Sequence, residues 1–149
     1  MSTKQSVSVE VTHRYSASPE RVFDAWLDPE MIDGWMFGPS QRDEEVVRVT
    51  VDARVGGTFS FVVRRQGQEI DHVGEYLEIE RPRRLSFTWA AAVVGEKPDA
   101  SRVTVEITPL DDGCELTLMH ELHPEWADFA DRTRDGWGTI LAALEKAVG

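Results

Sequence analysis

The stretch Cys114-Glu115-Leu116-Thr117-Leu118-Met119-His120-Glu121-Leu122 alternates in hydrophobicity, and the chain changes period just beyond it. Alternation at every second residue is typical of a strand with one buried face. After Pro124, the residues of one face instead recur at spacings of three and four: Trp126, Phe129, Ala130, Thr133, Trp137, Ile140, Leu141, Leu144 and Val148. This spacing predicts a helix of about six turns with one broad apolar face.

Strand patterns continue upstream from this stretch as far as Glu45. Apolar residues alternate with polar ones around Val47–Val51, Phe59–Val63, residues 69–80, Leu85–Ala91 and Val103–Ile107. Turn signals separate these segments: Gly56-Gly57, Gly67, Arg81-Pro82, Gly95 to Asp99 and Asp111-Asp112-Gly113. Consecutive strands joined by short turns favour an antiparallel sheet.

The N-terminal part adds one strand and two short helices. Val7 to Thr12 alternates and predicts a half-buried strand. Ser18-Pro19-Glu20 supplies an N-cap residue, a proline and an acid, so a short helix is predicted over residues 19–27. Asp28-Pro29-Glu30 starts a second short helix, which Gly38-Pro39 ends.

This order of elements predicts an α+β fold. One curved antiparallel sheet of about seven strands must cover the apolar face of the long C-terminal helix, because each has a face to bury. We expect a single domain over residues 1–149. A sheet curved around one helix leaves a cavity between the two, and the short helices can close one end of it.

Composition narrows the classes of partner. Lys plus Arg number 16 and Asp plus Glu 27, so the net charge of the 149 residues is −11. Such a charge repels nucleic acid and anionic lipid, and neither nucleic-acid binding nor membrane insertion is predicted. The single cysteine, Cys114, allows no internal disulfide, and we find no signal peptide, so a cytoplasmic location is expected.

Motifs for metal or nucleophilic chemistry are not supported. His120-Glu121-Leu122-His123 has its histidines three residues apart, whereas zinc proteases need four on a helix. On a predicted strand, these two side chains point to opposite faces. We therefore predict no metal and no cofactor, and no catalytic residue is assigned.

Two histidines and a tyrosine are the candidate polar groups of the interior. His120 shares the face of Leu116 and Leu118, so its imidazole is predicted to point inward, either as a hydrogen-bonded core residue or as a polar anchor in a cavity. His72 and Tyr76 share one face of their strand. Because Val73, Leu77 and Ile79 share the other, the pattern does not decide which face is inner.

Aromatic residues complete the candidate site. Plain packing explains many aromatic side chains, but an apolar pocket with a few polar groups is also the usual composition of a ligand site. The candidate cavity residues are Trp35, Phe37, Phe59, Phe61, His72, Tyr76, Trp89, His120, Phe129 and Trp137. Gly136 and Gly138 flank Trp137 inside the predicted helix, either tolerated there or allowing the close approach of a backbone or ligand.

A series of motifs resembles one protein family over nearly the whole chain. The motifs are Ser18 to Trp26 with Asp28-Pro29-Glu30, Trp35-Met36-Phe37-Gly38-Pro39, Asp52 to Phe59, Gly74 to Ile79, Pro82, Arg84 to Trp89, His120 and Gly136-Trp137. They resemble the heat-shock protein 90 ATPase activator homologue-like domain of the START/Bet v 1-like (SRPBCC) superfamily. This resemblance implies a helix-grip fold. It implies for function that relatives bind apolar ligands, act as cyclases or aromatases, act as resistance proteins or assist a chaperone.

Three functions stay open on the sequence. The favoured one is binding of a small apolar or aromatic molecule in the cavity. A cyclase or hydrolase would use the same cavity, with His120, His72 or Tyr76 as acid or base, and it needs two or more polar groups within reach of each other. A module that contacts a chaperone would show an exposed apolar patch over a filled interior. The patterns identify no ligand and leave open a homodimer.

Overall fold

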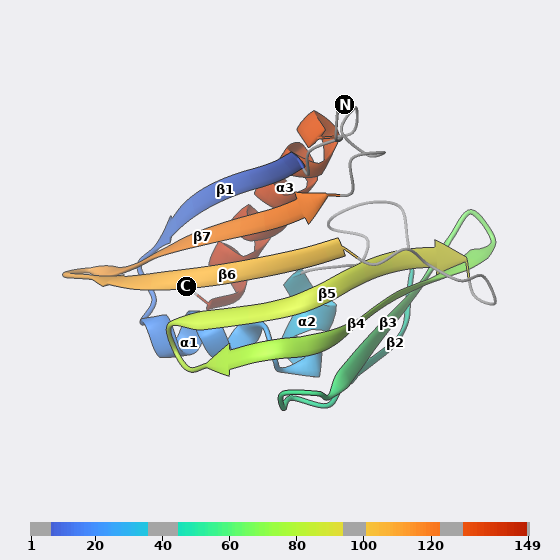
Figure 1. Ribbon diagram of the computed structural model, residues 1–149, viewed down its shortest axis with the longest axis horizontal. Coiled ribbons are helices and arrows are strands. Elements are labelled where there is room, and N and C mark those ends of the chain that lie inside the picture. The colour runs from blue at the N-terminus through green and yellow to red at the C-terminus, as the bar shows by residue number, and fades with distance from the viewer. Residues whose placement is uncertain (1–6, 36–44, 94–100, 123–129, 149) are drawn as a thin grey trace, which may run out of the picture.

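A computed structural model describes residues 7–35, 45–93, 101–122 and 130–148, and its element order matches the predicted one (Figure 1). The elements are β1 (Val7–Tyr15), α1 (Pro19–Ala25), α2 (Pro29–Trp35), β2 (Glu45–Val51), β3 (Thr58–Arg65), β4 (Gln68–Glu80), β5 (Arg84–Val93), β6 (Ser101–Leu110), β7 (Gly113–Leu122) and α3 (Ala130–Val148). The expected helical position of Trp126 and the end signal at Gly38-Pro39 lie outside the described residues.

The strands form one curved antiparallel sheet in the order β1-β7-β6-β5-β4-β3-β2. Each strand after β2 pairs with its neighbour in sequence, as the short turns between them require. β1 closes the other side by pairing with β7. The predicted helix-grip fold is therefore confirmed. No helix within the described residues has the length and apolar character needed to cross a membrane.

Helix α3 packs across one face of the sheet, behind β1, β7 and β6 (Figure 1). Its buried residues are Trp137, Ile140, Leu141, Leu144 and Val148, at the spacing of three and four that the sequence shows. The hydroxyl of Tyr15 donates to the carbonyl oxygen of Leu141 at 2.9 Å and ties β1 to the middle of this helix.

The short helices form where the start signals predict them. The Ser18 hydroxyl accepts a hydrogen bond from the backbone N–H of Arg21, so α1 begins with a capped turn. α1 ends at Ala25, two residues before the predicted boundary, and Trp26 is its C-cap. β1 in turn runs on to Tyr15, three residues past the predicted Thr12.

A β-bulge decides which face of β4 is inner. The pairing of β4 with β5 shifts register between Tyr76 and Glu78. A bulge inserts one residue and reverses the alternation beyond it. His72 and Tyr76 are consequently buried before the bulge, and Ile79 packs against the core after it.

Candidate functional site

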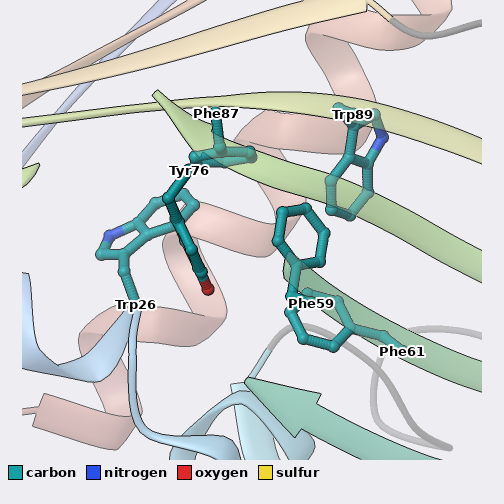
Figure 2. A pocket seen from close by; sticks show the side chains of 6 residues that line it. All are labelled: Trp26, Phe59, Phe61, Tyr76, Phe87 and Trp89. Carbon is teal, nitrogen blue, oxygen red and sulfur yellow. The ribbon is translucent and has the colours of Figure 1, made fainter. Parts of the chain in front are cut away.

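Six aromatic side chains border a small space between the sheet and the segment that follows α1. They are Trp26, Phe59, Phe61, Tyr76, Phe87 and Trp89 (Figure 2). Five of them project from the same face of β3, β4 and β5, because alternate residues of a strand share a face. The sixth, Trp26, closes the space from the other side. The site is thus an aromatic pocket, a name kept below for these six residues.

A glycine lets one of these rings lie directly on the sheet. Phe59 in β3 is the Cα partner of Gly74 in β4. A Cβ atom at Gly74 would lie only 2.5 Å from the Cζ atom of Phe59 and 1.9 Å from the carbonyl oxygen of Thr88. Glycine is therefore needed at this position, and it places Phe59 within ring-contact distance of Phe61, Tyr76, Phe87 and Trp89.

The turn between β2 and β3 fixes Tyr76. The backbone N–H of Tyr76 donates to the Gly57 carbonyl oxygen, and the Gly56 N–H donates to the Tyr76 carbonyl oxygen, both at 2.9 Å. Gly56 has a φ of 86°, which suits glycine. The residue that carries the pocket's hydroxyl group is thus anchored through its own backbone on both sides.

The Tyr76 hydroxyl is a polar atom in an aromatic surrounding. The residue is 2% exposed, and within the described part of the chain its hydroxyl has no hydrogen-bond partner. Figure 2 shows the oxygen pointing into the space between Trp26 and Phe59. Burial, with a smaller contribution from the Asp52 carboxylate, raises the pKa of this phenol, so the hydroxyl keeps its proton.

The pocket is small. Its volume is about 10 Å³, close to what a single water molecule requires. A molecule of the size of a benzene ring can enter only when a lining side chain moves.

Trp26 is the lining residue whose polar atom is buried without a partner. Its side chain is 3% exposed, and the indole Nε1 has no hydrogen bond. Figure 2 shows this nitrogen turned away from the other lining rings. Trp35 packs edge-on against it, with ring centroids 4.8 Å apart, while donating its own Nε1–H to Ala25. An unpaired buried donor costs about 1–3 kcal/mol, so the indole of Trp26 is held at a cost by its packing.

An ion pair fastens the helix that carries Trp26. Arg81, in the turn between β4 and β5, contacts both carboxylate oxygens of Asp24 in α1, from Nε at 2.7 Å and from a terminal nitrogen at 2.9 Å. These hydrogen bonds lower the pKa of the Asp24 carboxyl. Both side chains are about half exposed, so the pair positions α1 more than it stabilises the fold.

A hydrogen-bonded chain adjoins the pocket through Trp89. The Trp137 indole N–H donates to Nδ1 of His120 at 3.0 Å, and Nε2 of His120 lies 2.6 Å from the Ser101 hydroxyl oxygen. The Ser101 hydroxyl donates to the Trp89 carbonyl oxygen at 3.0 Å. Because an indole N–H only donates, Nδ1 is the acceptor and the proton of the neutral imidazole sits on Nε2.

This proton arrangement excludes His120 as a base for Ser101. In a catalytic pair the imidazole accepts the hydroxyl proton, whereas here Nε2 already carries a proton and donates it to Ser101. Burial also lowers the pKa of His120 to about 4. The imidazole is therefore a neutral, fully bonded core residue that links α3 to β7 and β6.

His72 is similarly tied to the sheet. Its Nδ1 lies 3.1 Å from the Phe61 carbonyl oxygen, and since a carbonyl only accepts, Nδ1 carries the proton. Its ring lies 5.5 Å from that of Trp89. His72 and Tyr76 are four residues apart on one strand, roughly 13 Å along it, too far to act on one proton.

The structure brings some of the predicted site residues together and not others. Phe59, Phe61, Tyr76 and Trp89 line the pocket. His72, His120 and Trp137 are buried beside it, and Trp35 packs behind Trp26. Phe37 and Phe129 lie outside the described residues. A ligand-binding role for these residues remains a prediction.

Two lining residues were missed by sequence reasoning. Phe87 shares the face of Leu85 and Trp89 in the alternating pattern, which was the signal that could have found it. Trp26 belongs to the apolar stripe of the first short helix, and its spacing is that of an ordinary core residue.

Among the described residues no group of three or more His, Cys, Asp or Glu side chains could hold a metal ion. The predicted absence of a metal remains untested.

Comparison with known proteins gives a family and a fold. The family model described as Activator of Hsp90 ATPase homolog 1-like protein matches residues 16–149. No curated protein matches the chain.

Similar solved structures come from bacteria. Protein CV1439 from Chromobacterium violaceum is 26% identical, with 95% of this chain and 96% of that one covered and a TM-score of 0.77. Mll3558 from Rhizobium loti is 27% identical, with coverages of 96% and 97% and a TM-score of 0.77. CalU16 from Micromonospora echinospora is 26% identical, with coverages of 97% and 77% and a TM-score of 0.70.

Proposed function

The chain belongs to the family of activator of Hsp90 ATPase homolog 1-like proteins, and from this premise we propose that it binds one small apolar or aromatic molecule in the aromatic pocket. The helix-grip fold supports ligand-binding domains in general. The observation that carries the proposal is the hydroxyl of Tyr76, which belongs to a residue that is 2% exposed, lies among five aromatic rings and has no hydrogen-bond partner in the described part of the chain. A few polar groups in an otherwise apolar pocket are the usual composition of a ligand site.

Binding requires one ring to leave its place, and we expect that ring to be Trp26. The other five are fixed in the sheet, whereas Trp26 follows a helix of seven residues. Its Nε1 is buried without a partner, so moving the indole toward water would let this N–H form a hydrogen bond. This gain offsets part of the cost of opening.

The polar groups favour a binder over an enzyme. An acid–base mechanism needs two groups within reach of the same reacting atoms. The described lining offers a single hydroxyl, since His120 has both ring nitrogens engaged and His72 lies roughly 13 Å along the strand from Tyr76. One orienting group is enough for a binding protein.

A thermal-shift and calorimetric titration with 2-acetonaphthone tests this function. Binding to the folded state should raise the melting temperature with ligand concentration. Trp26→Leu should then tighten binding about fivefold, because the variant no longer has to displace an indole with its unpaired donor.

Trp35→Leu is the matched control. Trp35 is equally buried and touches Trp26, but it does not line the pocket. It should lower stability without tightening binding. Absence of any titratable binding to the wild-type chain and to Trp26→Leu would overturn the proposal and favour a module that acts through its surface.

A further inference from the structure

The hydroxyl of Tyr76 determines which functional group a ligand of the aromatic pocket needs. Its oxygen points into the space between Trp26 and Phe59 (Figure 2). The nearest ring contacts of Tyr76 are Phe59 at 5.4 Å and Phe87 at 6.3 Å between centroids, and neither side chain has a hydrogen-bonding atom. A molecule bound in the pocket, in place of the water that its volume admits, would supply the missing partner.

The missing partner is an acceptor. The phenol stays protonated, since burial and the nearby Asp52 carboxylate both disfavour its anion. A protonated hydroxyl without a partner uses its O–H best on a carbonyl, ether or similar oxygen.

The charges around the site select a neutral molecule. None of the six lining residues is a lysine, arginine or histidine, so an anionic ligand would be buried without a counter-charge. Asp52, whose charge acts on Tyr76, is already paired with Arg54, from Oδ2 to Nε at 2.9 Å. A cationic ligand would therefore find the aromatic faces but no carboxylate among the six described lining residues.

We propose that Tyr76 makes the pocket selective for neutral aromatic molecules that carry a hydrogen-bond-accepting oxygen, such as aryl ketones. This inference rests on the proposed binding function. Tyr76 acts in it as the group that orients the ligand, with the O–H donating to the ligand oxygen and the rings of Phe59 and Phe87 packing on its flat body.

The test compares four naphthalenes of nearly equal shape by competition calorimetry. They are 2-acetonaphthone, 2-ethylnaphthalene, 2-naphthoate and 2-(aminomethyl)naphthalene, which are respectively a neutral acceptor, an apolar mimic, an anion and a cation. The wild-type chain should bind the ketone about fivefold more tightly than the ethyl compound, the gain typical of one neutral hydrogen bond. Tyr76→Phe should abolish this preference and leave the affinity for the ethyl compound unchanged.

Tyr15→Phe is the matched control. It removes the chain's other tyrosine hydroxyl, which is equally buried but bonded to Leu141, and it should keep the fivefold preference. Equal binding of the ketone and the ethyl compound, or tightest binding of the naphthoate or the amine, would overturn the role of Tyr76 while the binding function stands. Failure of all four compounds to bind would overturn the binding function itself.

Discussion

Tyr15 and Tyr76 are the two tyrosines of the chain, and their side chains are 3% and 2% exposed. The hydroxyl of Tyr15 donates to the Leu141 carbonyl oxygen at 2.9 Å. That of Tyr76 has no partner among the described residues. Burial raises the pKa of both phenols. The two residues share a chemistry and a degree of burial. They differ in whether a described residue accepts a hydrogen bond from the hydroxyl.

The indoles repeat this contrast. Trp137 donates to His120, and Trp35 donates to the Ala25 carbonyl oxygen. Trp26 alone has a side-chain polar atom that is fully buried and unpaired in the described part of the chain. The hydroxyl of Tyr76 and the indole N–H of Trp26, which lack described partners, both belong to the aromatic pocket. The hydroxyl and indole groups that have partners connect α3 or α2 to neighbouring elements.

The difference separates a structural part of the core from the part where we propose that a ligand binds. A satisfied buried polar group contributes about 0.5–1.5 kcal/mol to stability, whereas an orphaned one costs about 1–3 kcal/mol. Stability should therefore depend on the α3 region, and it should respond little to polar changes in the pocket. The predictions that follow test this division, beginning with the largest effect.

Leu141→Ala should lower the free energy of unfolding by about 2–5 kcal/mol. Leu141 is fully buried in the middle of α3, so the truncation leaves a cavity beneath the helix that Tyr15 anchors. Urea denaturation measures the effect, and Thr139→Ala, at an exposed position of the same helix, should change it by less than about 0.5 kcal/mol. A similarly small effect at Leu141 would remove α3 from the structural part of the core.

Acid should weaken the hydrogen bonds that His120 makes with Trp137 and Ser101 before it affects the aromatic pocket. The pKa of His120 falls from 6.5 to about 4 on burial, so the unfolded chain takes up the proton first as the pH drops. The neutral imidazole's contribution is complete above about pH 6.5 and declines by about 3 kcal/mol as the pH falls to 4.

Denaturant titrations between pH 7 and pH 4 measure this loss. His120→Gln lacks the titrating group but keeps all carboxylates, so subtracting its profile isolates the imidazole. A His120 proton resonance that titrates near pH 6.5 in the folded chain would contradict the buried, neutral state.

Local patterns were sufficient to predict the fold. Alternation such as Leu116, Leu118, His120 gives the buried face of a strand directly, and the change to spacings of three and four after Pro124 marks α3. Strand ends coincide with turn residues. Short turns then leave antiparallel neighbours as the simplest arrangement, which the strand order confirms.

The candidate site was less accessible to such reasoning. Both faces of β4 carry apolar residues, and the bulge after Tyr76 that sets its inner face leaves no mark in the periodicity. The partners of His120 come from two other elements, β6 and α3, which only tertiary packing brings together. Trp26 joins the pocket for the same reason.

Removing each tyrosine hydroxyl should separate the two parts of the core. Tyr15→Phe leaves the Leu141 carbonyl oxygen without its donor and should lower the free energy of unfolding by about 1 kcal/mol. Tyr76→Phe removes a hydroxyl that makes no hydrogen bond to a described residue, and its effect should lie within about 0.5 kcal/mol of zero or be stabilising. Denaturation with urea, without added ligand, gives both values. A loss of about 1 kcal/mol from Tyr76→Phe as well would mean that this hydroxyl is satisfied, and the contrast would fail.

The smallest expected effect concerns Gly136 and Gly138, which flank Trp137 in α3. A Cβ atom at either position would meet no atom of the described residues within 4 Å, so close packing of another backbone does not explain them there. Gly→Ala at each should raise the free energy of unfolding by up to about 1 kcal/mol through helix propensity. Ala142→Gly, at an exposed site of the same helix, should lower the free energy of unfolding by a similar amount. This control measures the cost of a glycine in α3. If Gly138→Ala instead weakens binding of 2-acetonaphthone while stabilising the chain, the ligand extends from the pocket to α3, and the two parts of the core are not separate. Unchanged binding in a stabilised variant supports their separation.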